Sequence, residues 1–227
     1  MEKEINIVFL DNREDLTKNQ MQYFMNSLLQ MKERGTEKEK NIMKDKAIVD
    51  LKNGQFSMQI DTGVKINFRG ETLLVDLTTE GELDVNSLRK VERLRKDNIS
   101  HLTLFAVDLC LDSKDGDPVT GELFGRAIKE KCKNNFDVLY MSGNINFWHS
   151  QDISEERWFA YRSVREDNID ERFEATAASP YTYMLLENFG KDDPMFALLK
   201  YLLCSRYYCR QYLGVVLLKA YIMLKAK

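Results

Sequence analysis

Hydrophobic and polar residues alternate with a period of two in the stretch 60–79, and this pattern is typical of β-strands with one buried face. Two runs show it, the first with apolar residues Val64, Ile66 and Phe68 and the second with Leu73, Val75 and Leu77. Between the runs, Arg69-Gly70 has the composition of a tight turn. The pattern therefore predicts an antiparallel hairpin in which Val64 faces Val75 and the apolar side chains share one side of the sheet.

The other side of this predicted hairpin carries two carboxylates. Gly63 lies opposite Asp76 in the register above, so Asp61 and Asp76 become diagonal cross-strand neighbours. Two like charges this close repel each other unless a cation lies between them, and a divalent metal ion bound by carboxylate oxygens is the usual cation. The competing interpretation is a solvated strand surface on which Lys65 neutralises one of the acids. Asp61 and Asp76 are therefore the predicted metal ligands.

Helical periodicity dominates the segments around the hairpin. Asp15 or Thr17 is the predicted cap of a helix that runs to about residue 34, and Asp84 is the predicted cap of a helix that runs to about residue 97. The second of these helices is predicted to turn four apolar residues inward: Val85, Leu88, Val91 and Leu94. The remaining predicted elements are helices at 122–140 and beyond Pro194, and apolar strands at 5–10 and 101–109.

The order of these elements predicts an α/β (α+β) fold, in which a small mixed β-sheet is flanked by helices. All predicted strands lie in residues 1–150, which form the predicted nuclease-like domain, and residues 151–227 are predicted to be a helical extension or linker. The layout is that of a PD-(D/E)XK nuclease core, where a lysine two residues after the second acid assists catalysis. Thr78 occupies that position here, so Lys90 on the following basic helix is the predicted catalytic lysine.

Composition narrows the classes of protein. The chain has 227 residues, of which 44% are hydrophobic and 30% charged, and a net charge of -3, so it is expected to be globular and is not a strongly basic nucleic-acid binder. Its four cysteines lack the close pairs of a structural zinc site, which favours reduced thiols in an intracellular protein. The apolar run 213–224 is interrupted by Lys219 and is too short to span a bilayer, so a buried helix is expected and no membrane partner.

Residues 50–176 resemble, in the order and spacing of their elements, the N-terminal cap-snatching endonuclease domain of the orthomyxovirus polymerase acidic protein. In that family an acid opens the hairpin, a second acid follows on the partner strand, and the lysine comes from the next helix, which matches Asp61, Asp76 and Lys90. The resemblance implies an RNA endonuclease with two Mn²⁺ or Mg²⁺ ions that cleaves capped host RNA. It also implies other viral polymerase subunits as partners and a location in the host nucleus.

The chain departs from this family in two ways. No histidine precedes His101, although the family has a metal-binding histidine on an early helix. The family also has a further acid before the hairpin, and the candidates here are Glu33, Glu37, Glu39, Asp45 and Asp50. The missing histidine weakens the second metal site. The alternative is therefore the same fold with a degenerate, inactive site, acting as a structural module of a polymerase.

Two further functions are compatible with local motifs. Asp61-Thr62-Gly63 is the signature of retroviral-type aspartic proteases, which pair two such aspartates in a homodimer, although that fold is nearly all β. Near the C-terminus, tyrosines and arginines offer stacking surfaces for single-stranded RNA, or else pack in helices. The residues of this aromatic group are Tyr201, Tyr207, Tyr208, Tyr212, Tyr221, Arg206 and Arg210.

Overall fold

The computed structural model describes residues 3–51, 54–60, 63–112, 119–131, 135–142, 159–161, 185–187, 189–205 and 207–227. Its strands are β1 (Lys3–Asp11), β2 (Lys46–Asp50), β3 (Gln55–Ile60), β4 (Val64–Thr72), β5 (Leu102–Asp108), β6 (Phe136–Ser142) and β7 (Phe159–Tyr161). They form one sheet in the order β2-β3-β4-β1-β5-β6-β7. The α/β fold class and the mixed sheet predicted from the sequence are confirmed.

Most of this sheet is parallel. β1 pairs with β4 and β5, β5 pairs with β6, and β6 pairs with β7, all in parallel, whereas β2 and β3 add an antiparallel ribbon beyond β4. Across the sheet, the parallel strands lie in the order β4, β1, β5, β6, β7. The second parallel strand in the chain, β4, thus lies on one side of the first, and the other three follow in chain order on the other side. This is the flavodoxin-like, doubly wound order. It does not confirm a PD-(D/E)XK core.

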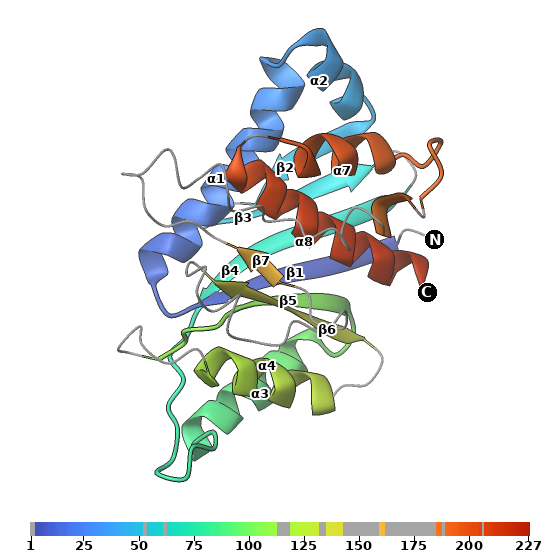
Figure 1. Ribbon diagram of the computed structural model, residues 1–227. Helices are drawn as coiled ribbons and strands as arrows, with labels where there is room; N and C mark the ends of the chain where they lie inside the picture. Colours follow the sequence, from blue (N-terminus) through green and yellow to red (C-terminus); the bar gives the residue numbers. More distant parts are fainter. Residues whose placement is uncertain are drawn as a thin grey trace.

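Helices cover both faces of the sheet (Figure 1). The helices are α1 (Glu14–Glu33), α2 (Glu37–Met43), α3 (Val85–Asn98), α4 (Val119–Lys131), α7 (Phe196–Leu203) and α8 (Tyr208–Lys225). On one face α1, α7 and α8 share a core with Phe9 of β1 and Leu104 of β5. On the other face α3 and α4 share a core with Leu10 and Phe105. The alternation of side chains along each strand thus divides the apolar residues between two cores.

The sequence supplies local reasons for these helices. The stripe Met21, Phe24, Met25 and Leu28 is buried, as an amphipathic α1 requires. Asp84 caps α3 by accepting a hydrogen bond from the Ser87 N–H, as predicted, whereas α1 begins one residue before Asp15 and has no side-chain cap. Only part of the predicted α3 face is buried, because Val91 and Leu94 lie in the core while Val85 and Leu88 are exposed.

The predicted hairpin is wrong. Arg69 and Gly70 lie within β4 and make no turn, and β4 instead pairs with β3, so that Val64 lies opposite Ile60. Val64 and Val75 are both buried, but they belong to cores on opposite faces of the sheet. The two alternating runs therefore belong to one long strand and to the crossover that follows it, a distinction that periodicity alone does not make.

The C-terminal part of the chain is predicted as an extension, yet it contributes to the main core. α8 packs in one hydrophobic cluster with α1 and the sheet, and β7 joins the sheet beside β6. The predicted helix 122–140 is half right, because α4 ends at Lys131 and β6 begins at Phe136. The apolar run 213–224 is buried in α8, as predicted. Within the described residues, no helix is long and apolar enough to cross a membrane.

Candidate functional site

The strand order reverses direction at β1. The next parallel strand in the chain, β4, lies on one side of β1. From β4 the chain crosses through α3 to β5, which lies on the other side of β1. In doubly wound sheets, ligands bind at the carboxyl ends of the strands where the order reverses. Here those ends are occupied by Asp11, the last residue of β1, and Asp108, the last residue of β5.

Asp11 and Asp108 occupy neighbouring positions. The parallel register of β1 and β5 pairs Leu10 with Val107, so the next position on each strand is an aspartate. Neighbouring strands lie about 4.8 Å apart. Phe9 and Ala106, two residues earlier on each strand, belong to the same core, so the two aspartates also share one face of the sheet. The fold therefore places two carboxylates side by side.

Both aspartates are shielded from water, since Asp11 is 1% exposed and Asp108 is 8% exposed. One oxygen of Asp11, Oδ1, accepts a hydrogen bond of 3.0 Å from the Arg13 backbone N–H. Two negative charges repel each other strongly where water is excluded, also when each carboxylate has other contacts. A cation between them removes this electrostatic repulsion. The arrangement is suited to hold a divalent cation.

The chain segments that leave the strands at this edge are bonded to one another. The Asn12 side-chain amide donates to the Asp112 carbonyl at 2.7 Å, and the Val75 N–H donates to the Leu111 carbonyl at 2.8 Å. The Leu109 N–H donates to the Met141 carbonyl at 2.9 Å, which ties the end of β5 to β6. These cross-links hold the ends of β1, β4, β5 and β6 as one preorganised platform.

The start of α4 lies directly against the end of β5. A Cβ atom on Gly121 would lie 2.0 Å from the Asp108 carbonyl oxygen, so no larger residue fits there without movement of the helix. Thr120 fastens the same contact, because its Oγ1 accepts from the Leu111 N–H at 3.0 Å and donates to the Leu109 carbonyl at 3.3 Å. The start of α4 therefore packs against the backbone at the end of β5.

Arg13, between the site and α1, adds a cationic side chain. It precedes α1 as the N-cap residue, and its carbonyl accepts the Thr17 hydroxyl at 2.8 Å. The Nε atom of Arg13 is buried and has no hydrogen-bond partner among the described residues. A donor of this guanidinium is therefore available close to Asp11.

Of the two residues predicted as metal ligands, the structure describes Asp76. Asp61 lies outside the described residues, but its neighbour Gly63 precedes β4 and Asp76 follows it. The nine residues of β4 span about 30 Å. Asp76 is exposed, and its backbone is bonded to Ser87 at the start of α3. The hairpin on which the metal prediction was based is therefore not formed, and the role of Asp61 and Asp76 as metal ligands stays a prediction.

The predicted catalytic lysine, Lys90, is bonded to the backbone two residues before Asp76. The Lys90 ammonium donates a hydrogen bond to the carbonyl of Leu74. Leu74 lies four residues after Gly70, where the turn was predicted. Among the early acids, Glu39 is committed to a capping box in α2 and to contacts with Tyr201 and Arg210. Cleavage of RNA with Mn²⁺ or Mg²⁺, and a place in a polymerase, remain predictions from the resemblance.

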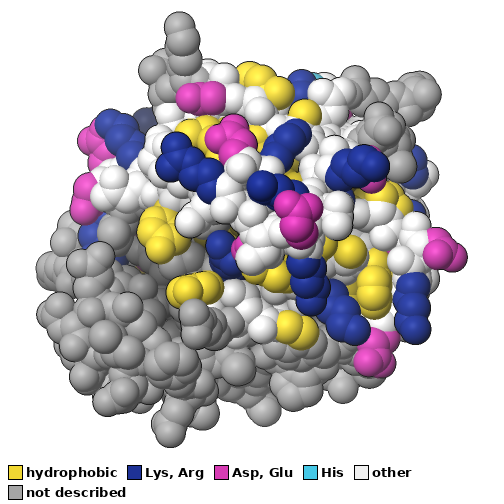
Figure 2. Space-filling view, turned by 90° about the horizontal axis from the view of Figure 1, so that it is seen from above, with side chains coloured by type: hydrophobic (Ala, Val, Ile, Leu, Met, Phe, Trp, Pro, Cys, Tyr) yellow, Lys and Arg dark blue, Asp and Glu magenta, His cyan; other side chains and the backbone are white. Residues whose placement is uncertain are grey.

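The other two predicted functions stay predictions. Asp61 and Thr62 of the protease signature lie outside the described residues, and the surrounding fold is α/β rather than all β. Of the aromatic group, Tyr212 and Tyr221 are buried and serve packing. On the face shown in Figure 2, the described Lys and Arg side chains are interspersed with Asp and Glu and form no single basic surface.

The sequence does contain a signal for the site that was found only in the structure. Each of two apolar runs of strand length, 5–10 and 102–107, is followed at once by an aspartate. In parallel strands such residues meet at one edge, but the parallel pairing of these two runs was not predicted. Within the described residues, no three acidic, histidine or cysteine side chains converge as a metal cage. Comparisons with protein-family models, with curated proteins and with solved structures find no match to this chain.

Proposed function

We propose that this chain is a phosphoryl-acceptor domain in which Asp108 takes up a phosphoryl group beside a divalent cation. The observation that carries the proposal is the placement of Asp11 and Asp108 as buried neighbours at the carboxyl ends of β1 and β5. Mg²⁺ is the cation that this donor set favours, because it binds through one or two carboxylates and keeps several waters. A cage of more protein ligands is not needed.

The two aspartates have different environments, and this assigns their roles. Asp11 is the more deeply buried, and the Arg13 N–H orients it, which suits a carboxylate that only binds the cation. Asp108 is the more accessible of the two, which suits the carboxylate that meets the phosphoryl group. Bound Mg²⁺ would neutralise charge as the phosphoryl oxygens approach.

The transfer is a simple displacement. With acetyl phosphate as donor, a carboxylate oxygen of Asp108 forms a bond to phosphorus while the bond from phosphorus to the acetate oxygen breaks. The electron pair leaves with acetate, and an aspartyl phosphate remains on the chain. The Arg13 guanidinium and the α4 N-terminus are the groups of this chain that can offset the added negative charge.

Proteins of many functions share this strand order, so a function is inferred from the site and only by analogy from the fold. Flavodoxins bind a flavin phosphate at the switch point, whereas receiver domains carry acidic residues there and accept a phosphoryl group. Two adjacent carboxylates would repel the phosphate of a flavin in the absence of a cation. The acidic edge of this sheet therefore favours phosphoryl acceptance.

Intact-mass spectrometry after incubation with acetyl phosphate and Mg²⁺ tests the proposal. The wild-type chain should gain the mass of one phosphoryl group, which hydroxylamine removes because aspartyl phosphates are acyl phosphates. Asp108→Asn should gain none, and Asp11→Asn should react much more slowly. Asp97→Asn is the matched control, since Asp97 is an exposed acid near the end of α3. A modification that persists in Asp108→Asn would contradict the proposal.

A further inference from the structure

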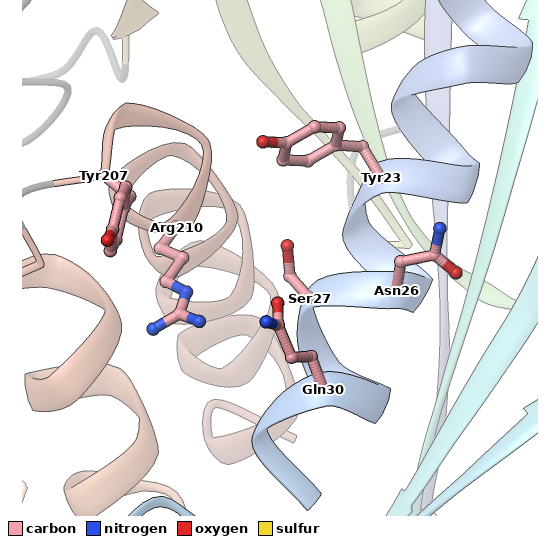
Figure 3. Close-up of a pocket in the computed structure, with 6 residues that line it drawn as sticks. All are labelled: Tyr23, Asn26, Ser27, Gln30, Tyr207 and Arg210. Atoms are coloured by element: carbon pink, nitrogen blue, oxygen red, sulfur yellow. The ribbon is translucent and has the colours of Figure 1, made fainter. Parts of the chain in front are cut away.

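A polar pocket of about 400 Å³ lies between α1 and the first turn of α8 (Figure 3). Six residues line it: Tyr23, Asn26, Ser27, Gln30, Tyr207 and Arg210. Its volume is at the lower end of the range for small-molecule sites. A ligand of the size of one planar heterocycle with a few substituents would fit it.

The residues that α1 contributes to this pocket are regularly spaced along the helix. Tyr23, Asn26, Ser27 and Gln30 have the spacing i, i+3, i+4, i+7, so they form one stripe beside the apolar stripe that packs in the core. A helix stripe that faces another helix is usually apolar, whereas this one carries two amides and two hydroxyls. Figure 3 shows Tyr23, Ser27 and Gln30 extending from α1 toward α8.

Arg210 is held in place on the opposite wall. Its Nη1 donates to Glu39 Oε1 and to the Tyr201 hydroxyl, each at 3.1 Å, and its guanidinium lies 5.3 Å from the Tyr207 ring centroid. Only 13% of its side chain is exposed. Within the part of the chain that the structure describes, Arg210 Nε and Nη2 and the Gln30 amide make no hydrogen bond, so these donors are available to a ligand.

The charge of the pocket walls limits the kind of ligand that can bind. Glu39 is ionised, because hydrogen bonds from Tyr201 and Thr36 lower the pKa of its carboxyl to about 2, and it balances the charge of Arg210. The wall is therefore polar but close to neutral, which favours a neutral ligand with donors and acceptors over a free anion. Tyr23 is 58% exposed and Tyr207 is 54% exposed, so each residue has open surface at the rim beside the contacts that it makes within the fold.

We propose that this pocket binds one unpaired nucleobase. Tyrosine rings stack on bases of any sequence, amide side chains pair with base edges through matched donors and acceptors, and arginine donates to base carbonyls and ring nitrogens. Of the aromatic group noted in the sequence, only Tyr207 and Arg210 are part of this site among the described residues. The same chemistry serves a free nucleotide and a base in single-stranded RNA.

Isothermal titration calorimetry with AMP, GMP, CMP and UMP, and with a short single-stranded oligoribonucleotide of mixed sequence, tests the proposal. At least one of these probes should bind saturably, and Tyr207→Ala and Gln30→Ala should each weaken it by about tenfold. Both residues are on the surface, so the variants should fold, and circular dichroism melts check this. Asn19→Ala, at another exposed position of α1, is the matched control and should bind as wild type.

The two arms distinguish the sources of the base. A nucleotide that binds as tightly as the oligoribonucleotide identifies the site as one for free nucleotides, whereas binding of the oligoribonucleotide alone identifies it as a contact for an RNA strand. The absence of saturable binding by every probe would overturn the proposal. Binding that neither Tyr207→Ala nor Gln30→Ala weakens would overturn it as well.

Discussion

Glu39 on α2 and the aspartate pair at the carboxyl edge of the sheet are both shielded carboxylates, but the protein treats them differently. Glu39 accepts from Tyr201 at 2.6 Å, from Arg210 at 3.1 Å and from the Thr36 N–H at 2.8 Å, so its charge is matched within the fold. Asp11 and Asp108 instead place two like charges on neighbouring strands. The contacts of Glu39 support structure, whereas two adjacent carboxylates can together hold a cation.

Replacement of the carboxylate by an amide is therefore expected to change stability in opposite directions at Glu39 and at Asp108. Replacement of Glu39 by its amide removes a favourable charge, and replacement of Asp108 by its amide removes an unfavourable one.

The largest effect is expected where α4 meets β5. Gly121→Ala should lower the free energy of unfolding by about 3 kcal/mol, because its Cβ would collide with the Asp108 carbonyl and the Leu109 backbone. It should also slow phosphorylation, because α4 must move away from Asp108. Urea denaturation measures the first effect and intact-mass time courses the second.

Gly190→Ala is the matched control for this experiment, because nothing lies within 4 Å of a Cβ at that position. It should change the free energy of unfolding by less than about 0.5 kcal/mol. Equal losses in the two variants would show that the close packing of α4 on the site has no special role.

A smaller loss is expected at the balanced carboxylate. Glu39→Gln should lower the free energy of unfolding by about 2 kcal/mol at neutral pH, because it weakens hydrogen bonds to a charged group. Those bonds lower the pKa of Glu39 from 4.5 to about 2. Its contribution to stability is therefore complete above pH 4.5 and is lost as the pH falls toward 2.

Urea titrations of wild type and Glu39→Gln between neutral and acidic pH measure this. The difference between the two proteins should shrink as the pH falls through this window. A difference that stays constant with pH would contradict the assignment of Glu39 as a structural, ionised group.

The smallest effects are expected at the residues of the endonuclease prediction. Asp76 lies in the segment between β4 and α3, and Lys90 is bonded to the backbone of that segment. Neither belongs to the aspartate pair or to a buried core, so Asp76→Ala and Lys90→Ala should leave phosphorylation unchanged and stability within about 0.5 kcal/mol. An RNA cleavage assay with Mn²⁺ completes the test. Metal-dependent cleavage by wild type that both substitutions abolish would restore the endonuclease hypothesis in place of the present one.

The fold class, α3 with its Asp84 cap, and the buried C-terminal helix could be predicted from the sequence because each depends on local periodicity or a local cap. The partner of β4 could not, because alternation shows that a strand has a buried face without showing which strand lies beside it. The error placed a turn at Arg69-Gly70 and joined Asp61 to Asp76. The aspartates that do meet, Asp11 and Asp108, are 97 residues apart in the chain, and only the parallel pairing of β1 and β5 connects them.

Thermal unfolding of wild type and Asp108→Asn, each in EDTA and in millimolar Mg²⁺, measures whether Asp11 and Asp108 together bind the cation. Without the cation the variant should melt at a higher temperature than wild type, because it lacks the repulsion between Asp11 and Asp108. Mg²⁺ should raise the melting temperature of wild type by binding the folded state and should leave that of the variant nearly unchanged. A variant that is less stable than wild type in EDTA, and that Mg²⁺ stabilises to the same extent, would contradict the account.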